Sequence, residues 1–476
     1  MNIVSARALD LMLDSWRASG STPAYEALAD RIRLLILDGR IALGVRLPAE
    51  RDLAAQLGVS RTTVAAAYAE LRDRDYLTSV RGSGSIARQP HGVAAPNEAP
   101  SSGILDFSKA SLPALQQLAD AAATAVEQLP AYLGGTGFDP VGLPVLRQAL
   151  ADRYTSRGLP TSPDQIMVTI GAQHAIALLA RTLLGRGDRA LVEAPSYPHA
   201  IDALKAAGAR LVPVSVTTHD GWDEEALEQA FQRTSPSLGY LMPDFHNPTG
   251  RSMSAALREK TLALAARQGT TLIADETIGE LGMDDVEPVL PFAAYGAVDT
   301  QAILVGSVGK TVWGGVRVGW IRAERSVIQR LIRERASGDL GTPALEQLIV
   351  TNLLGDYDSV LETRRRQLRA GRHTLARLLA EKIPEWEMPH VAGGLTAWVN
   401  LGAPVSSQLT LAARNEGLQI AAGPRFGIDG AFERFLRIPF SYSESDTERA
   451  VDALAVAWRN VGRHSIADTG WLAEVV

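Results

Sequence analysis

A lysine in a glycine-rich loop is the residue of this chain whose surroundings most suggest chemistry. Lys310 ends the stretch Gly306-Ser307-Val308-Gly309-Lys310, which follows an apolar run, and Arg317 lies seven residues further on. A lysine amine shielded from water can bond covalently to a carbonyl carbon, and Ser307 and Arg317 are suited to hold phosphate oxygens. Because a lone lysine is nearly always a solvated surface group, this interpretation depends on the motifs around it.

Two further motifs offer a phosphate cradle and a flat stacking surface. Gly171, Ala172 and Gln173 follow an apolar run and open a helix, where exposed backbone N–H groups can bind phosphate. Tyr197 follows the next apolar run, in Glu193-Ala194-Pro195-Ser196-Tyr197-Pro198, and its ring could stack on a planar ligand. Taken alone, the first signal is weak, and a core tyrosine explains the second equally well.

An amide and a carboxylate complete the set of motifs. Asn247, in Asn247-Pro248-Thr249-Gly250, offers an amide donor to a phenolic oxygen, and its bond to Pro248 is expected to be cis. Asp275 ends an apolar run just before Glu276, where a carboxylate can keep a pyridine nitrogen protonated and make the ring an electron sink. Each motif also has a simpler explanation, an ordinary turn for the first and a helix cap for the second.

Short apolar runs that alternate with amphipathic helices are expected to position these residues. From Leu105 onward this alternation predicts an α/β major domain with a mostly parallel sheet, and a smaller α+β cap over about residues 356–462. The apolar runs that predict strands are Gln165–Thr169, Arg189–Val192, Leu211–Val216, Leu238–Met242, Thr271–Ala274 and Ala302–Val305.

An arginine-rich segment before this domain predicts a winged helix-turn-helix. Two helices are expected over about 25–36 and 49–57, and Ser60 is expected to cap a third that starts at Arg61. Arg61, Thr62 and Thr63 then point outward in its first turn, where side chains can read the DNA major groove. The alternative is a three-helix bundle with solvated surface arginines.

Three stretches of this segment form a recognisable set: Gly44-x-x-Leu47-Pro48-Ala49-Glu50-Arg51, Leu57-Gly58-Val59-Ser60-Arg61-Thr62-Thr63-Val64 and Arg81-Gly82-Ser83-Gly84-Ser85. With them, residues 22–87 closely resemble the GntR-type winged helix. The last of these stretches lies in a predicted β-hairpin wing over 76–87. The residues that the resemblance and the helix pattern together assign to the DNA-binding surface are Arg51, Ser60, Arg61, Thr62, Thr63, Arg81 and Gly82.

The five motifs of the larger domain, in this order and spacing, resemble fold type I pyridoxal phosphate enzymes of the aspartate aminotransferase superfamily, across about residues 105–462. The resemblance implies that pyridoxal 5'-phosphate bonds to Lys310 and that Arg437, in Phe435-Leu436-Arg437-Ile438-Pro439, pairs with an effector carboxylate. A surface salt bridge is the alternative for Arg437. The residues that would bind the cofactor are Gly171, Ala172, Gln173, Tyr197, Asn247, Asp275, Ser307, Lys310 and Arg317.

Two positions lack a phenol that this superfamily usually supplies. Thr277 and Ile278 stand where a tyrosine usually bonds the cofactor phenolate, and Phe138 matches a tyrosine that reaches the phosphate of the neighbouring subunit. Cofactor binding is expected to survive these changes. Fast transamination is not expected, because its proton transfers depend on a positioned base.

Composition and charge restrict the class of protein. The chain has no cysteine and no run of eighteen apolar residues, and charged residues interrupt its first twenty positions, so a cytoplasmic protein without a membrane span is expected. No metal site is expected. The net charge of −6 does not favour nucleic acid, but residues 22–87 hold nine Arg and no Lys against eight acidic residues, a net charge of +1. DNA binding would therefore depend on where the arginines point.

Both halves in this order resemble MocR-type regulators, the GntR subfamily that joins a winged helix to an aminotransferase-like domain. Asn247 and the Asp275-Glu276-Thr277 stretch suggest its YczR-like branch. The resemblance implies a homodimer that binds double-stranded operator DNA and senses a small amine or amino acid. The alternatives are an active aminotransferase that carries a DNA-binding head and a regulator whose large domain has lost the cofactor; we predict a regulator and not a physiological enzyme.

The predicted division of the chain follows from these observations. The parts are a lead helix over 1–21, the winged helix over 22–87, a linker over 88–104, the aminotransferase-like domain over 105–462 with its small cap over about 356–462, and a tail over 463–476.

Overall fold

The structure of the chain is a computed structural model that describes residues 3–13, 16, 23–37, 40–42, 44–80, 84–88, 104–284, 289–296, 302–428 and 430–461. The described residues form two compact units. One contains the chain up to residue 108, residues 400–436 and the C-terminal helix from 449 onward. The other contains residues 109–399 and 437–448 and includes the predicted site.

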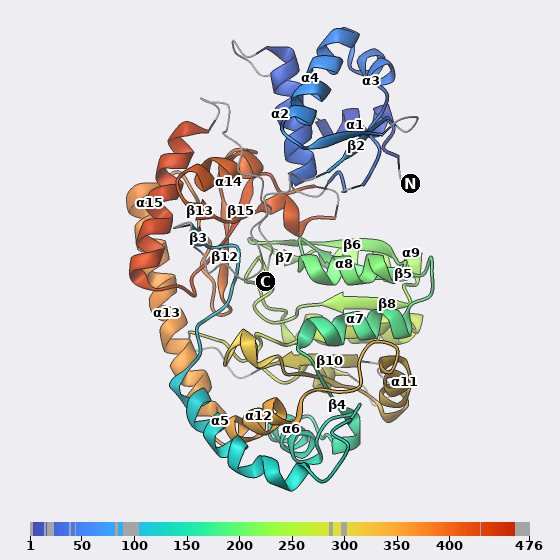
Figure 1. The fold of residues 1–476 in the computed structure, drawn as a ribbon. Helices are drawn as coiled ribbons and strands as arrows, with labels where there is room; N and C mark the ends of the chain where they lie inside the picture. The colour runs from blue at the N-terminus through green and yellow to red at the C-terminus, as the bar shows by residue number, and fades with distance from the viewer. Residues whose placement is uncertain are drawn as a thin grey trace. The chain divides into compact units, whose positions relative to one another are not determined.

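An eight-stranded sheet forms the centre of the second unit (Figure 1), with the strand order β4–β11–β10–β9–β8–β5–β6–β7. From β10 to β6 every neighbouring pair is parallel, whereas β11 is antiparallel to both its neighbours and β7 is antiparallel to β6. The mostly parallel sheet predicted from the sequence is therefore confirmed. The strands are β4 (Ile166–Thr169), β5 (Arg189–Ala194), β6 (Arg210–Thr217), β7 (Gly221–Trp222), β8 (Leu238–Leu241), β9 (Thr271–Asp275), β10 (Ala302–Ser307) and β11 (Gly319–Arg322).

Helices cover this sheet and explain why its strands are nearly continuous apolar runs. Every residue of β4, β8, β10 and β11 is buried, as expected for strands with both faces covered. The helix α7 packs against β10 and β11, and α8 and α9 pack against β6. The helices of this unit are α5 (Gln116–Gln128), α6 (Pro144–Ser156), α7 (Ala172–Leu183), α8 (Pro198–Ala206), α9 (Glu224–Thr234), α10 (Ala255–Gln268), α11 (Arg325–Arg335), α12 (Ala344–Leu354) and α13 (Tyr357–Lys382).

The sheet directions bring the sequence motifs to one edge. Because β11 is antiparallel to both β4 and β10, β4 runs in the same direction as the parallel strands. The carboxyl ends of β4, β5, β8, β9 and β10 therefore lie at a common edge, where ligands bind in open α/β sheets. Each of the five motifs follows or ends one of these strands.

The C-terminal part of the chain adds a smaller sheet, with the strand order β12–β15–β14. Its middle strand carries Arg437, which is fully buried. The short strand β13 instead pairs in parallel with β3, which directly precedes the second unit in sequence. These elements are β3 (Leu105–Asp106), β12 (Thr396–Asn400), α14 (Ser406–Asn415), β13 (Leu418–Gln419), β14 (Ala421–Ala422), β15 (Phe435–Pro439) and α15 (Glu444–Asn460). Of the described helices, none combines the length and apolar character needed to cross a membrane.

The N-terminal part contains four helices and a β-hairpin among its described residues. Ser60 caps α4 by accepting a hydrogen bond from the Thr63 N–H at 3.1 Å, and α3 ends at Gly58, both as predicted. Gly58 adopts the left-handed conformation. The elements are α1 (Ala6–Leu13), α2 (Ala24–Leu37), α3 (Glu50–Leu57), α4 (Arg61–Asp73), β1 (Leu77–Val80) and β2 (Gly84–Ala87). The antiparallel pair of β1 and β2 confirms the hairpin, but Arg81 and Gly82 lie outside the described residues.

Candidate functional site

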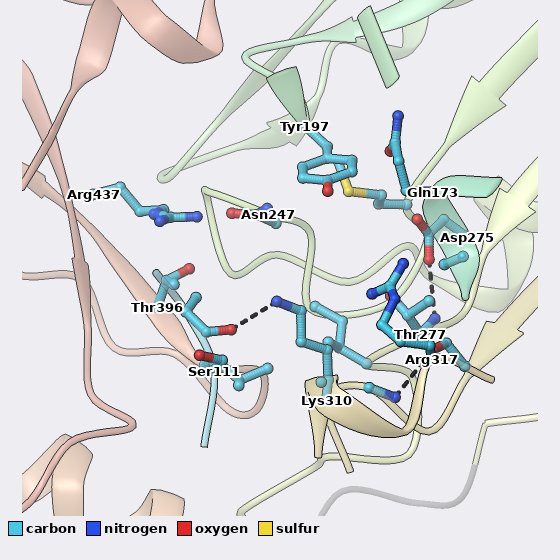
Figure 2. A pocket seen from close by; sticks show the side chains of 18 residues that line it. Ser111, Gln173, Tyr197, Asn247, Asp275, Thr277, Lys310, Arg317, Thr396 and Arg437 are labelled. Atoms are coloured by element: carbon cyan, nitrogen blue, oxygen red, sulfur yellow. Dashed lines mark hydrogen bonds between the residues drawn. The ribbon is translucent and has the colours of Figure 1, made fainter. Parts of the chain in front are cut away.

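Lys310 projects into a pocket at the carboxyl edge of the large sheet (Figure 2). It follows β10, and its Nζ donates a hydrogen bond to the carbonyl oxygen of Ala110 at 2.7 Å. Nine residues were predicted to bind the cofactor. Lys310 and seven of the others line this pocket, and Gly171 directly precedes the lining residue Ala172. The seven are Ala172, Gln173, Tyr197, Asn247, Asp275, Ser307 and Arg317.

The charge state of Lys310 is set by its surroundings. Burial, together with the nearby positive charges of Arg437 and Arg317, lowers the pKa of Lys310 to about 8, although the carboxylate of Asp275 acts in the opposite direction. A substantial fraction of the amine is therefore neutral near physiological pH. Only the neutral amine can attack an aldehyde, so this pKa suits a lysine that bonds to a carbonyl carbon.

This pKa gives a testable prediction for the uptake of pyridoxal phosphate. We expect the rate of uptake to rise with pH to about 8 and then to level, because the neutral fraction of Lys310 rises through its pKa. Arg437→Gln removes a positive charge that lowers this pKa, so its profile should move to higher pH. Stopped-flow absorbance of cofactor-free protein measures the rate, and Arg330→Gln on the exposed face of α11 is the control. Coincident profiles for the two variants would contradict the assignment.

Asp275 is held by two hydrogen bonds at the end of β9. Its side chain is 5% exposed, Oδ1 accepts from the Thr277 N–H at 3.0 Å, and Oδ2 accepts from the Tyr240 hydroxyl at 2.8 Å. Burial raises the pKa of Asp275, whereas Thr277, Tyr240 and the charge of Lys310 lower it. Burial has the larger effect, so the pKa of Asp275 lies above its ordinary value, and the two hydrogen bonds limit that rise. The ionised form is the one that can pair with a protonated ring nitrogen.

The start of α7 forms the predicted phosphate cradle. Gly171 precedes the helix with a φ of +83°, and the Arg317 guanidinium donates to the Ile170 carbonyl at 3.0 Å. A Cβ on Gly319 would lie 2.6 Å from the Gly171 carbonyl carbon, so only glycine lets β11 pass this close to the helix start. The Ser307 hydroxyl donates to the Val318 carbonyl at 3.1 Å and accepts from the Gly309 N–H at 3.0 Å. These contacts bring Ser307, Arg317 and the first backbone N–H groups of α7 together.

Tyr197 and Asn247 line the pocket from the loops after β5 and β8. Both loops contain cis peptide bonds, at Ala194–Pro195 and at Asn247–Pro248, and the second was predicted from the sequence. Burial raises the pKa of Tyr197 to about 12, so its ring stays neutral. Behind the loops, Glu193 accepts hydrogen bonds from the Trp222 ring N–H at 2.8 Å and from the Met242 N–H at 2.9 Å. This buried carboxylate therefore links the two segments that present Tyr197 and Asn247.

Arg437 lies across the pocket from the phosphate cradle. In Figure 2 it stands on one side of Lys310, while Asp275 and Arg317 stand on the other. The side chain of Arg437 is fully buried and lines the pocket, so it does not lie at the surface as the alternative interpretation required. A ligand joined to Lys310 could extend a carboxylate toward Arg437. Thr277 and Ile278, which stand where the superfamily usually has a tyrosine, also line the pocket.

The residues of the pocket fit pyridoxal phosphate. Among the described residues, the buried side-chain oxygens of Asn247 and Gln173 have no hydrogen-bond partner, although both residues line the pocket. Buried polar atoms normally have partners, so these two indicate a polar ligand. A lysine, a carboxylate and a phosphate cradle around one cavity match the aldehyde, the ring nitrogen and the phosphate of this cofactor.

The predicted DNA-binding side chains gather at the start of α4 and on α3. Arg51 and Arg61 are 83% and 73% exposed, and Arg61 lies 4.0 Å from Glu50. The Ser60 hydroxyl shares hydrogen bonds of 2.7 Å with the hydroxyls of Thr62 and Thr63. The opposite face of α4, with Val64, Ala67, Tyr68 and Leu71, is buried as predicted. The first turn of α4 is therefore open to a partner.

Sequence reasoning missed several residues at the site. Tyr240 contacts Asp275, and Ala110 accepts the Lys310 hydrogen bond, but neither was named. Arg364 on α13 is fully buried and donates to the Thr311 carbonyl at 2.8 Å, next to Lys310. A tyrosine inside an apolar strand was the one available signal, because a buried hydroxyl needs a partner.

Known proteins match both parts of the chain. Residues 102–454 match the family described as aminotransferase class I and II, and residues 24–86 match the gntR family of bacterial regulatory proteins. The HTH-type transcriptional regulator YisV of Bacillus subtilis (strain 168) is 27% identical, over 95% of this chain and 99% of its own length. The HTH-type transcriptional regulator YdcR of Escherichia coli (strain K12) is 29% identical, over 89% of this chain and 96% of its own length.

A solved structure also resembles the larger part of the chain. LysN, the α-aminoadipate aminotransferase of Thermus thermophilus complexed with N-(5'-phosphopyridoxyl)-L-leucine, has a TM-score of 0.69 and 28% identity, over 76% of this chain and 93% of its own. The fold type I architecture and the pairing of domains predicted from the sequence are confirmed. The two relatives that match nearly the whole chain are named as transcriptional regulators, which agrees with the class of function predicted from the sequence.

Proposed function

The chain belongs to the family of class I and II aminotransferases and carries a domain of the gntR family, and from this premise we propose that it is a pyridoxal phosphate-dependent transcription regulator. In this proposal the N-terminal domain binds double-stranded DNA, and the large domain binds a small amine or amino acid through the cofactor. The protein acts in the cytoplasm as a homodimer.

The convergence of four charged side chains on one pocket carries this proposal. All four line the pocket. With the cofactor bound, Arg317 would hold its phosphate, Asp275 would pair with its ring nitrogen and Lys310 would bond to its aldehyde carbon. Arg437 would receive the effector carboxylate. Bound pyridoxal phosphate supplies an aldehyde and an electron-withdrawing ring. The chain's own residues bind and orient the ligand, and Lys310 holds or releases a proton at Nζ.

The absence of two expected tyrosine hydroxyls favours a regulator over a working aminotransferase. Neither Thr277 nor Ile278 provides a phenol for the cofactor, and Phe138 has no hydroxyl to offer a neighbouring subunit. A lost hydrogen bond to a charged group costs about 1.5–3 kcal/mol. Efficient transamination needs tuned proton transfers, so we expect residual activity at most.

The contacts of Lys310 support a route from the ligand to the rest of the chain. Lys310 donates to Ala110, and Ala110 lies in the segment that continues, through β3, from the predicted linker. Arg364 donates to the carbonyl of Thr311 at 2.8 Å and to that of Pro113 at 2.6 Å, and so ties the lysine loop to the same segment. A Lys310 bonded to a ligand would keep at most one N–H, so its contact with Ala110 would change. Whether the amine is engaged therefore alters the contacts of this segment.

Exposed apolar side chains support the homodimer. Phe138 is 70% exposed and Leu340 is 55% exposed, and the bridge between Asp139 and Gly341 places the two side chains on neighbouring backbone segments. Large exposed apolar residues that lie together usually mark a protein interface. Analytical ultracentrifugation measures the oligomeric state directly.

The decisive test measures DNA binding in the presence of ligands. A duplex selected from a random pool would be titrated with the full-length protein alone, with pyridoxal phosphate, and with the cofactor and a panel of amines and amino acids. The proposal expects at least one amine to change DNA affinity only when the cofactor is bound. No change with any member of the panel, together with transamination at rates typical of enzymes, would favour the aminotransferase alternative.

The role of Arg437 gives a prediction about the ligand. Arg437→Gln is expected to weaken binding of amino acids to the cofactor-loaded protein by about ten- to a hundredfold, because a hydrogen-bonded charge pair is lost. Amines without a carboxylate should bind both proteins equally. Spectral titration of paired ligands, such as alanine and ethylamine, measures the difference. An equal loss for both ligands would show that Arg437 is structural.

A further inference from the structure

A tyrosine on β8 contacts Asp275 at the end of the neighbouring strand β9. Tyr240 is fully buried in β8, and its hydroxyl donates to Asp275 Oδ2 at 2.8 Å. The strand register pairs Tyr240 with Ile273, two residues before Asp275. Side chains two residues apart on a strand share a face, so Tyr240 and Asp275 lie on the same face of the sheet. The register thus aims the phenol at this carboxylate.

The two hydrogen bonds to Asp275 leave its carboxylate accessible from the pocket. Oδ1 is occupied by the Thr277 N–H and Oδ2 by Tyr240, and the carboxylate still lines the pocket. A carboxylate oxygen can accept more than one hydrogen bond, so a protonated ring nitrogen can add to these two. Two fixed donors would hold the plane of the carboxylate before the ligand arrives.

We propose that Tyr240 is a positioning residue that keeps the Asp275 carboxylate ionised and directed at the ring nitrogen of pyridoxal phosphate. This inference rests on the proposed function, because it requires that the pocket bind the cofactor. Tyr240 does not line the pocket, so it acts through Asp275.

The charges around the pair support this role. The titratable groups that face Asp275 are Tyr240 on β8, Tyr197 after β5 and Lys310 after β10. Burial and the charge of Asp275 raise the pKa of Tyr240 well above its usual value, so its hydroxyl remains a donor across the accessible pH range. Burial raises the pKa of Asp275, and the Tyr240 hydrogen bond opposes that change. Removing the hydroxyl should therefore raise the pKa of Asp275 further.

Loss of the Tyr240 hydroxyl should raise the pH below which cofactor binding weakens. Cofactor binding that needs the ionised carboxylate is strong above the pKa of Asp275 and weak below it. Because Tyr240→Phe raises that pKa, the acid side of its binding profile should move to higher pH. We expect a move of about one pH unit and roughly tenfold weaker binding on that side, as for one lost hydrogen bond to a charged group.

Tyr154→Phe is the matched control. Tyr154 is also buried, and its hydroxyl accepts a hydrogen bond from the Trp320 ring N–H at 3.0 Å. The two variants thus each lose one buried, hydrogen-bonded hydroxyl, and their thermal unfolding temperatures should fall by similar amounts. Of these two tyrosines, Tyr240 is the one that donates to Asp275, so Tyr240→Phe should move the pH profile and Tyr154→Phe should not.

The experiment measures the dissociation constant of pyridoxal phosphate against pH for the full-length wild type and both variants, from absorbance and tryptophan fluorescence. Titration of the free cofactor is common to all three proteins and does not affect their comparison. A profile moved to higher pH in Tyr240→Phe alone supports the inference. Coincident profiles for the two variants overturn it and leave the proposed function intact. A wild type that does not bind the cofactor overturns both.

Discussion

Replacing Lys310 with alanine is expected to abolish the visible absorption band that the wild type forms with pyridoxal phosphate. Lys310 is the one lysine that lines the described pocket, and its pKa is lowered to about 8, which leaves a reactive neutral amine. Alanine cannot bond to the aldehyde carbon, whereas Asp275 and Arg317 remain to bind the cofactor without a covalent bond. The expected result is therefore loss of the band with weaker, reversible binding.

Borohydride reduction and mass spectrometry measure the same bond directly. Reduced wild type should carry one cofactor per chain on the peptide that contains Lys310. Lys260→Ala removes a partly exposed lysine paired with Glu224 and Glu228, and it should behave as the wild type does. A band that persists in Lys310→Ala and disappears in Lys260→Ala would overturn the assignment. Absence of a band in every protein would mean that the large domain does not use the cofactor, and only the proposed DNA binding and dimerisation would remain.

The sequence predicted the site well where chemistry depends on a strand and the residues just after it. Asp275 and Lys310 sit at the ends of strongly apolar runs, and a parallel sheet brings such ends to one edge. Gly171 could be interpreted in the same way, because a helix start after a strand exposes its N–H groups. For these residues, local pattern and global topology agree.

Contacts between residues far apart in sequence were not predictable in this way. The hydrogen bond from Tyr240 to Asp275 depends on the register of β8 with β9, which an apolar run does not specify when both faces of a strand are buried. Arg364 donates to the backbone carbonyls of Thr311 and Pro113 and to the side chain of Gln367. Helical periodicity identifies neither a buried arginine nor its partners. These residues support the site and do not react.

The function of the N-terminal domain depends on a few exposed arginines and not on bulk charge. Residues 22–87 carry a net charge of only +1, from nine arginines and eight acidic residues, so nonspecific attraction to phosphate should be modest. Arg51 and Arg61 are the exposed arginines on α3 and at the start of α4. A domain of this kind reads DNA with side chains at the start of its recognition helix. Specific contacts would therefore supply much of its affinity.

The double variant Arg51→Ala, Arg61→Ala is expected to weaken binding to a selected duplex by at least about thirtyfold, because each specific arginine contact contributes about 1–3 kcal/mol. Arg74→Ala removes an arginine at the far end of α4, where it pairs with Glu70 at 2.7 Å, and serves as the control for lost charge. Fluorescence anisotropy measures both affinities at matched salt. Cofactor binding should be unchanged in every variant, since these arginines lie outside the pocket. Equal weakening by Arg74→Ala would mean that charge alone, and not the start of α4, binds the DNA.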